Sequence, residues 1–561
     1  MEELGLQDEG SAPPTLLDLP DQLLGAILSL ADTTSTHKGG AALTRVCLRF
    51  RSIYWAEPSV WGTLRIEAAA LDFLPARRQV AWLAGKRALL QRVSPVVSAL
   101  AVHDRAGALA IAARSMELGA AARVSSASAG TAPAGAGAGG TASSAPAAAA
   151  TGAMARGNGC RLEDLLCLLH PGIAREVELE VHPALPEAAL AALPRLGCQL
   201  TALNLDTRQL PPGTAAVLRR LRALHALRLG AAHVDAAAAA ACAALRHLSR
   251  LELEASFFAL PDLSPLAACA SLAALRLVDD SQRREPLLLP PPASFRGGQG
   301  LLSLTVYTRA LCQVAEARLG FVCLSCAQPA TGEGPAWASL SLDGRRRAAG
   351  SRLQPLSSLP ALLAATLPAG VPLRCLCLHG CQLAAADVTG CCAWLADVET
   401  FKAEGCTDER PGGFDSSNAG AGAVGFTVVL EPLLQAMPAL RKLELAACLA
   451  GKVPPWLAAK RGLRKLALPD NGLSDLPADP FLSTGVTELD LSRNSFARLP
   501  PALLAASDLE SLLLPGCAQL VLAAEEAEQL LQVLPRLRTV DLTGTAIAAD
   551  VVERLQRGLA R

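Results

Sequence analysis

The chain has 561 residues, of which 51% are hydrophobic and only 3% aromatic, and its 51 basic and 51 acidic side chains give a formal net charge of zero. A neutral chain has no overall electrostatic attraction for nucleic acid or for an acidic membrane surface, so we expect neither as a partner. The N-terminal stretch MEELGLQDEGSAPP lacks the basic and apolar regions of a secretory signal, and no run is apolar enough to span a bilayer. With 17 cysteines in no framework spacing, the sequence predicts a cytoplasmic or nuclear protein with unpaired thiols.

Residues 16–64 carry three short apolar patterns. In LLDLPDQLLGAILSL, which begins at Leu16, the apolar residues after the Leu-Pro pair share one helix face, and Pro20 suits a first helical turn. The apolar residues of LTRVCLRF predict a second helix, and IYWAEPSVWGTL contributes a third apolar group. So small a unit cannot bury all of these faces internally, so they need a partner surface.

The motifs LPDQLLGAIL, VCLRFRSI and VW in this segment resemble an F-box, the module that docks substrate receptors onto the Skp-type adaptor of SCF ubiquitin ligases. The resemblance implies adaptor contacts by Leu19, Pro20, Leu23, Leu24, Ile27, Leu28, Val46, Cys47 and Trp61. It departs from the family at Gln22, where Glu is usual, at Phe50, where Trp is frequent, and in a longer loop between the first two helices. The alternative is that these helices only cap the first leucine layer of the repeats that follow.

Residues 65–118 predict an amphipathic helix, ARRQVAWLAGKRALLQRV, and then a strand-like VSALAVH that belongs to a first repeat-like unit. Residues 119–160 are rich in alanine, glycine and serine and predict a flexible linker. Residues 161–561 predict the main repeat array, with inserted loops near 283–300 and 404–425.

The repeats are clearest where LRKLALPDNGLSDLP, VTELDLSRNSFARLP and LESLLLPGCAQL follow one another at intervals of 23 residues. Their alternating leucines place one face of a short strand in a core, and only neighbouring repeats can cover those leucines. Other copies begin at Leu200, Leu224, Leu248, Leu272, Leu301, Trp337, Leu373, Leu395, Leu440 and Leu537, with weaker ones near Val97 and Ala174. The pattern resembles the leucine-rich repeat, which implies an α/β horseshoe solenoid behind the small all-α N-terminal module.

The cysteines have a structural explanation in this register. Cys381, Cys448 and Cys517 fall at the position that Asn471 and Asn494 occupy in their repeats. The lone C-x-x-C of CLSC has no second pair to complete a zinc site, so we expect no bound metal. The basic stretch GRRRAAGSR is better explained as a solvated loop than as a localisation signal.

Strand residues that flank the buried leucines predict a concave recognition face. The candidate substrate-binding residues are Asp206, Arg228, Arg250, Glu252, Glu254, Arg276, Tyr307, Asp343, Asp397, Glu399, Glu444, Glu488 and Asp490. His379, Phe401, Lys442, Lys465 and Asp541 are assigned to equivalent strand positions. Acidic residues outnumber basic ones on this predicted face, which favours a partner with a basic patch.

The sequence contains no P-loop, G-x-S-x-G or H-E-x-x-H motif, and its two G-x-G-x-x-G matches lie in Ala/Gly-rich stretches without a preceding strand. We therefore expect a non-enzymatic protein without a cofactor. The F-box resemblance implies a substrate-recognition subunit of an SCF-type ubiquitin ligase, whose partners are the Skp-type adaptor, the cullin scaffold and an unknown protein substrate. The alternative is an interaction scaffold with an N-terminal cap. A regulator of a nucleotide-switch enzyme would need a protruding Arg or Asn, and none stands out.

Overall fold

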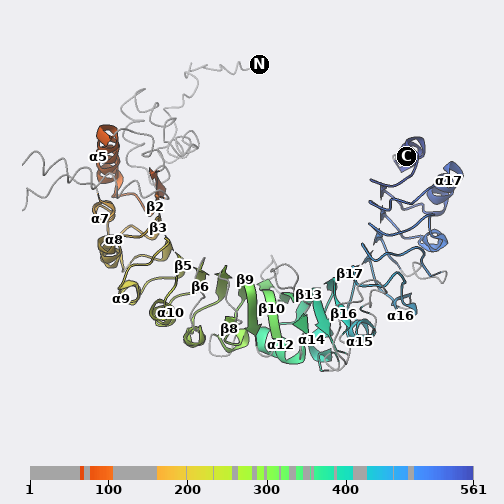
Figure 1. Ribbon diagram of the computed structural model, residues 1–561, viewed down its shortest axis with the longest axis horizontal. Coiled ribbons are helices and arrows are strands. Elements are labelled where there is room, and N and C mark those ends of the chain that lie inside the picture. Colours follow the sequence, from red (N-terminus) through yellow and green to blue (C-terminus); the bar gives the residue numbers. More distant parts are fainter. Residues whose placement is uncertain are drawn as a thin grey trace, which may run out of the picture. The chain divides into compact units, whose positions relative to one another are not determined.

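The structure is a computed structural model that divides into two compact units, residues 1–231 and 232–561, each described here by itself. It describes residues 63–68, 76–104, 161–197, 199–231, 233–255, 263–280, 287–295, 300–314, 317–327, 337–344, 354–355, 359–384, 388, 390–408, 426, 428–458, 460–477 and 485–559. In each unit the helices cover one side of a sheet and leave the other side, which we call the open face, uncovered (Figure 1).

The first unit is built on a parallel sheet. Its elements are β1 (Thr63–Glu67), α5 (Ala76–Val93), β2 (Ala99–Asp104), α7 (Leu162–Cys167), β3 (Glu176–Val181), α8 (Glu187–Ala192), β4 (Ala202–Asp206), α9 (Thr214–Leu218) and β5 (Ala226–Ala231). These strands pair in parallel in chain order, β1 to β5. The register aligns Leu64, Leu100, Val177, Leu203 and Leu227 in one buried row. Each row of apolar side chains is covered by its neighbours, as the repeat pattern predicts.

The beginning of the array differs from the expectation. Helix α5 and strand β2 match the helix and strand predicted for residues 65–118. However, Leu64, which the sequence places in the third apolar group of the N-terminal module, lies in β1 and is buried against the sheet. The alternation of TLRIE, with Leu64 and Ile66 inward, explains the strand. Within the described residues, the first strand of the array is therefore β1, which precedes the strand expected near Val97.

The second unit continues the repeat pattern. Its main strands are β6 (Arg250–Ala255), β7 (Ala274–Asp279), β9 (Ser303–Val314), β10 (Ala317–Ala327), β11 (Trp337–Asp343), β13 (Leu373–His379), β15 (Thr400–Glu404), β17 (Lys442–Ala446), β18 (Lys465–Ala467), β19 (Glu488–Asp490), β20 (Ser511–Leu513) and β21 (Thr539–Asp541). Its helices are α10 (Ala236–Ala243), α12 (Leu359–Thr366), α14 (Cys392–Leu395), α15 (Leu430–Gln435), α16 (Pro455–Ala458), α17 (Ala524–Val533) and α18 (Ala549–Leu559). The short strands β12 (Gln354–Pro355), β14 (Cys381–Leu383) and β16 (Thr407–Asp408) form a separate small parallel sheet.

Strand β10 interrupts this regular arrangement. It runs antiparallel to both β9 and β11, whereas β7 and β9, and all the pairs from β11 to β21, are parallel. After β9 the chain therefore returns within the sheet instead of behind it. This explains the 36 residues between the predicted starts at Leu301 and Trp337, an interval longer than the usual repeat.

In the second unit, a ladder of Asn and Cys side chains connects neighbouring repeats after β13, β15, β18, β19 and β20. Asn494 is buried, donates to the carbonyl oxygen of Leu468 one repeat earlier (2.8 Å), and accepts from the backbone N–H groups of Asn471 and Leu473 (both 3.0 Å). Asn471 makes the corresponding bonds, and the Cys517 thiol donates to Leu491 (3.4 Å). The predicted equivalence of Cys and Asn at this position is confirmed, and Cys406, which the sequence analysis missed, also belongs to the ladder.

The residue before each ladder position has a left-handed backbone. Ala447, Asp470 and Arg493 have φ values of 49°, 59° and 54°, and glycine occupies the same place before Cys381, Cys406 and Cys517. This conformation turns the chain sharply so that the ladder side chain points back under the preceding strand. Glycine adopts it without strain, which explains the recurring Gly-Cys pairs.

Described parts of both expected inserted loops form strands, and β16 lies at the start of the second. Within 283–300, β8 (Leu287–Leu289) pairs in parallel with the end of β9, and Leu287 and Phe295 are buried. The apolar run LLL, which was expected to lie in an inserted loop, is therefore an extra strand. No helix in the described ranges has the length and apolar character needed to cross a membrane.

Candidate recognition surface

The predicted adaptor-binding residues lie outside the described residues. This holds for all nine, from Leu19 to Trp61, because the structure describes nothing before Thr63. Their role stays a prediction from the sequence. The candidate substrate-binding residues, by contrast, can be placed on the two open faces.

The open face of the first unit is acidic. Glu176, Glu178 and Glu180 alternate along β3, and Glu67 and Asp206 occupy the same face on β1 and β4. The predicted residue Asp206 lies 3.9 Å from the guanidinium of Arg228 on β5, so both predicted residues are on this face. A basic surface on a partner would be attracted to it.

A histidine lies between these carboxylates. His103 on β2 has its Nδ1 atom 3.0 Å from Glu67 and its Nε2 atom 3.8 Å from Glu178. The Asn204 amide on β4 donates to the same Glu178 carboxylate at 2.8 Å. These contacts hold the acidic side chains in fixed positions along adjacent strands.

The acidic row of β3 was not predicted. The segment AREVELEV was expected to be one of two weaker copies of the repeat, and none of its residues was among the candidates for the open face. The strict alternation of glutamate with valine or leucine in EVELEV was sufficient to assign Glu176, Glu178 and Glu180 to one face.

The open face of the second unit carries most of the remaining predicted residues. The strand positions of Arg250, Glu252, Glu254, Arg276, Tyr307, Asp343, Glu444, Glu488 and Asp490 all alternate with buried residues. Several of the charges are paired across neighbouring strands, with nitrogen–oxygen distances of 3.3 Å for Arg276–Glu252, 2.7 Å for Lys402–Glu444 and 2.9 Å for Lys465–Glu488. This pairing reduces the excess of acidic charge that the sequence suggested for this face.

Two of the candidate residues, Asp397 and Glu399, do not occupy the open-face strand positions that were predicted for them. Asp397 lies in the turn after α14, and Glu399 precedes β15, where its carboxylate is 3.7 Å from Arg374. Phe401, assigned to the same face, is fully buried. The repeat begins at Val398 rather than at Leu395. The residues of β15 that reach the open face are Thr400, Lys402 and Glu404.

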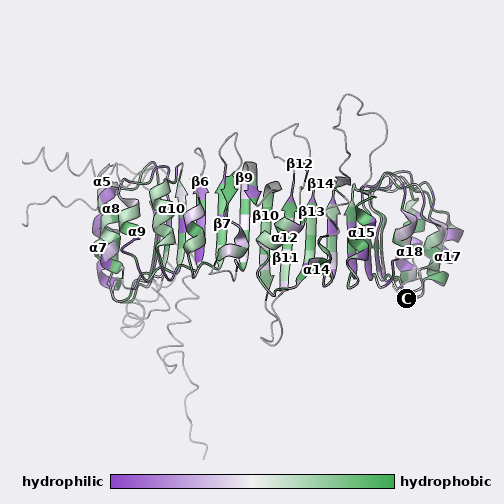
Figure 2. Cartoon of the chain, turned by 90° about the horizontal axis from the view of Figure 1, so that it is seen from below, coloured by the Kyte–Doolittle hydropathy of each residue, from purple (hydrophilic) through white to green (hydrophobic). Residues whose placement is uncertain are grey.

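Between β9 and β13 most described side chains of the open face are uncharged, and Asp343 at the end of β11 is an exception. Here the outward positions hold hydroxyl, thiol and aromatic side chains, namely Ser303, Thr305, Tyr307, Phe321, Cys323, Ser325, Ser339, Ser341, Cys375 and Cys377. The rings of Tyr307 and Phe321 are in contact, with centroids 4.8 Å apart. Figure 2, seen from the side of the helices, colours the buried residues of β10, β11 and β13 together with the outward ones, and these strands are mainly neutral to hydrophobic. Such a surface suits an uncharged part of a partner protein.

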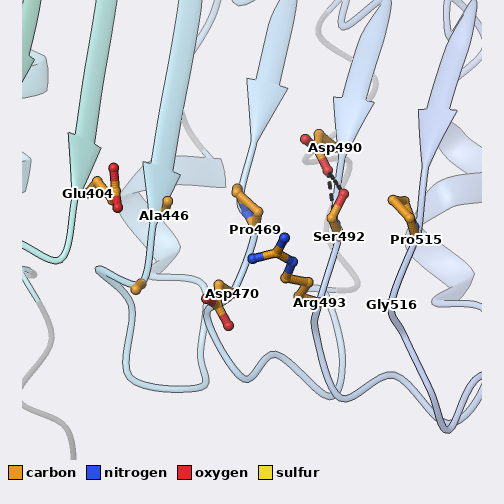
Figure 3. Close-up of a pocket in the computed structure, with 10 residues that line it drawn as sticks. Glu404, Ala446, Pro469, Asp470, Asp490, Ser492, Arg493, Pro515 and Gly516 are labelled. Atoms are coloured by element: carbon orange, nitrogen blue, oxygen red, sulfur yellow. Dashed lines mark hydrogen bonds between the residues drawn. The ribbon is translucent and has the colours of Figure 1, made fainter. Parts of the chain in front are cut away.

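A groove of about 480 Å³ lies where strands β15 to β20 end. It is lined by Glu404, Ala446, Ala447, Pro469, Asp470, Asp490, Ser492, Arg493, Pro515 and Gly516 (Figure 3). The carboxylate of Asp490 accepts hydrogen bonds from the backbone N–H and the hydroxyl of Ser492, while the Arg493 guanidinium lies beside Pro469 and Asp470. Both signs of charge line this groove, so it is suited to a polar side chain of a partner rather than to a small ion.

The thiol of Cys375 has an unusual acidity. Its hydrogen bond with Cys377, supported by one with Ser339 and by the charge of Lys402, lowers the pKa of Cys375 to about 6, whereas the same thiol contact raises the pKa of Cys377. Burial, in contrast, raises the pKa of Cys242 to about 12. Of these thiols, only Cys375 is largely ionised at neutral pH.

This acidity predicts the pH profile of alkylation. We expect the rate of iodoacetamide reaction at Cys375, measured by peptide mass spectrometry, to be nearly constant above pH 7 and to fall about tenfold per pH unit well below pH 6, because the thiolate is the nucleophile. A cysteine in a short peptide, with a pKa of about 8.5, should still gain about tenfold between pH 6 and 7. A Cys375 profile that follows the peptide would contradict the assignment.

No family model and no curated protein matches the chain. Among solved structures, it is similar to a leucine-rich repeat protein of Leptospira interrogans, with 15% identity, a TM-score of 0.41, and coverage of 70% of this chain and 95% of that one. It is also similar to an internalin from Listeria monocytogenes, with 19% identity, a TM-score of 0.34, and coverage of 65% of this chain and 81% of that one. A third similar structure is the leucine-rich repeat ectodomain of a membrane receptor kinase from Arabidopsis thaliana, with 15% identity, a TM-score of 0.32, and coverage of 70% of this chain and 47% of that one.

These similarities are weak, and the fold is established by the chain itself. The parallel strands recur with the repeat, their leucines form buried layers, and Asn and Cys side chains connect one repeat to the next. These are the structural features that the L-x-x-L-x-L-x-x-[N/C] pattern predicts. The described part of the chain therefore has the fold of a leucine-rich repeat solenoid.

Proposed function

We propose that the chain is the substrate-recognition subunit of an SCF-type ubiquitin ligase. In this proposal the open faces bind a target protein and residues 16–64 bind the Skp-type adaptor, which connects the receptor to the cullin scaffold. The receptor itself catalyses nothing. It raises the local concentration of the target's lysines near the ubiquitin-loaded enzyme.

The open faces are the observation that supports the proposed binding of a target protein. Strand after strand presents polar side chains outward on a backbone that is fixed by the ladder and by the buried layers. A rigid surface of this kind loses little conformational entropy when a partner binds. The acidic row of β3 favours a basic segment of the target, and the neutral region around Tyr307 and Phe321 favours an apolar or hydroxyl-bearing segment. The adaptor part is supported by the F-box resemblance of residues 16–64.

The test is co-expression of the full chain with a Skp-type adaptor. We expect the two to copurify, and we expect Leu23→Asp combined with Ile27→Asp to weaken capture at least 30-fold, because two charges enter an apolar contact surface. The matched control is Val521→Asp with Val533→Asp, which makes the same chemical change at two exposed apolar positions of the array. It should leave capture unchanged.

One observation favours the second candidate, an interaction scaffold whose N-terminal helices are a cap. Leu64 and Ile66 in the first strand β1 are 1% and 0% exposed, whereas Val540 in the last strand β21 and Leu542 beside it remain partly exposed. The first layer is thus covered, as a cap requires. Under this alternative, the Leu23→Asp and Ile27→Asp double variant lowers the unfolding midpoint of the array, and the wild-type chain captures no adaptor.

A further inference from the structure

Two thiols meet on the open face of the second unit. Cys375 and Cys377 are two residues apart on β13, so their side chains emerge on the same face, and their sulfur atoms are 3.8 Å apart. Both side chains are partly exposed, in contrast to the fully buried thiols of Cys242 and Cys312. The pair is therefore accessible from solvent.

The strand register places a cation beside this pair. Cys377 is the register partner of Lys402 on β15, and the Lys402 ammonium is fixed by Glu444 at 2.7 Å. On the other side, Ser339 and Ser341 of β11 are the register partners of the two cysteines and add hydroxyl groups. The surroundings thus stabilise negative charge on sulfur, in agreement with the lowered pKa of Cys375.

The geometry is near the limit for a disulfide and is unsuited to zinc. Residues two apart in a strand have Cα atoms about 6.6 Å apart, close to the upper limit of about 6.8 Å for a disulfide. Zinc needs four ligands, and the described residues contain no group of three or more His, Cys, Asp or Glu side chains placed to hold a metal. The nearest imidazole on the strand, that of His379, is hydrogen bonded to Glu404 at 3.0 Å.

A soft monovalent ion has different requirements. With metal–thiolate bonds of about 2.3 Å, sulfurs 3.8 Å apart can both contact one ion in a bent arrangement. Rotation about the side-chain torsions of two partly exposed cysteines can widen this distance toward a linear arrangement. Thiolates are the ligands that select monovalent copper.

We propose that Cys375 and Cys377 form a two-thiolate binding site for Cu⁺ on the open face. Two thiolates and one Cu⁺ form two copper–sulfur bonds and carry a net charge of −1, and the Lys402 ammonium, which is paired with Glu444, lies in the next strand. Each thiol that is not already ionised releases its proton to solvent as the ion binds, and no oxidation step is involved. The site is independent of the ubiquitin-ligase proposal, since its evidence is the geometry of β13 and β15.

The test is a competition for Cu⁺ against bicinchoninate under anaerobic conditions, with the full chain reduced beforehand. We expect the wild-type chain to remove one more equivalent of Cu⁺ from the chelator than the Cys375→Ser, Cys377→Ser double variant. The matched control is Cys323→Ser with Cys326→Ser, which removes two partly exposed thiols from β10 and should bind as the wild type does. Lys402→Gln should weaken Cu⁺ binding three- to tenfold while both thiols remain.

Three outcomes would overturn the proposal. The first is equal Cu⁺ binding by the wild type and the Cys375/Cys377 double variant. The second is an equal loss in the Cys323/Cys326 control. The third combines two observations. In the air-exposed protein, the peptide that contains both cysteines is 2 Da lighter, as a disulfide requires, and after reduction the protein binds no extra Cu⁺; the pair would then be a redox couple instead. If the double variant does not fold, the Lys402→Gln comparison decides.

Discussion

Replacing Asn494 with alanine is expected to lower the free energy of unfolding by roughly 4 kcal/mol, because it leaves several buried backbone groups without partners. The Asn494 amide donates to the carbonyl oxygens of Leu468 and Leu491, and its oxygen accepts from the N–H groups of Asn471 and Leu473. The side chain is 4% exposed, so water cannot replace these bonds. Urea unfolding followed by circular dichroism measures the effect.

The chain offers a graded control for this experiment. Cys517 occupies the same position in its own repeat. Its thiol donates to the preceding repeat, but cysteine has no side-chain oxygen that could accept from backbone N–H groups as the Asn494 amide does. Asn494→Cys should therefore cost less than Asn494→Ala and more than Arg536→Ala, which breaks only an exposed ion pair with Asp508. Equal stability of Asn494→Ala and Arg536→Ala would show that the ladder does not hold the repeats together.

Phe401→Ala is expected to lower the free energy of unfolding by about 3–5 kcal/mol, because it opens a large cavity in a fully buried layer. Lys402→Ala, its neighbour in β15, removes a partly exposed side chain and one ion pair with Glu444. Its cost should stay within about 1 kcal/mol. The same urea measurement compares the two variants.

This pair of variants tests the register of β15. If the repeat began at Leu395, Phe401 would lie on the open face and its removal would cost little. A small effect of Phe401→Ala and a large effect of Lys402→Ala would therefore contradict the strand pairing of β15 with β13 and β17.

The sequence was informative wherever leucine spacing was regular. It predicted helix α5 at its observed bounds, and it predicted the ladder role of cysteine. It failed around Leu395 because Leu395 in α14 and Val398 before β15 are both buried, so both fit the first position of the repeat. Hydrophobicity alone cannot distinguish two buried residues three positions apart.

The direction of β10 and the Cu⁺ site were not predictable from the sequence and were found only in the structure. The alternation in LGFVCLSC indicates a strand. Because this alternation is the same for parallel and antiparallel strands, the sequence does not distinguish another parallel repeat strand from a strand that returns antiparallel within the sheet. The alternation in LRCLCLH is enough to predict that Cys375 and Cys377 lie in one strand. Their sulfur–sulfur contact and the position of Lys402 depend on side-chain torsions and on the register between β13 and β15.

The central claim is that the chain has an adaptor-binding segment separate from its repeat array. Deuterium exchange of the full chain, with and without a Skp-type adaptor, tests it most directly. We predict that the adaptor protects peptides within residues 19–61 and leaves exchange between Leu463 and Leu520 unchanged, because the ladder there holds with or without it. Unchanged exchange throughout residues 16–64 in the presence of saturating adaptor would contradict the claim.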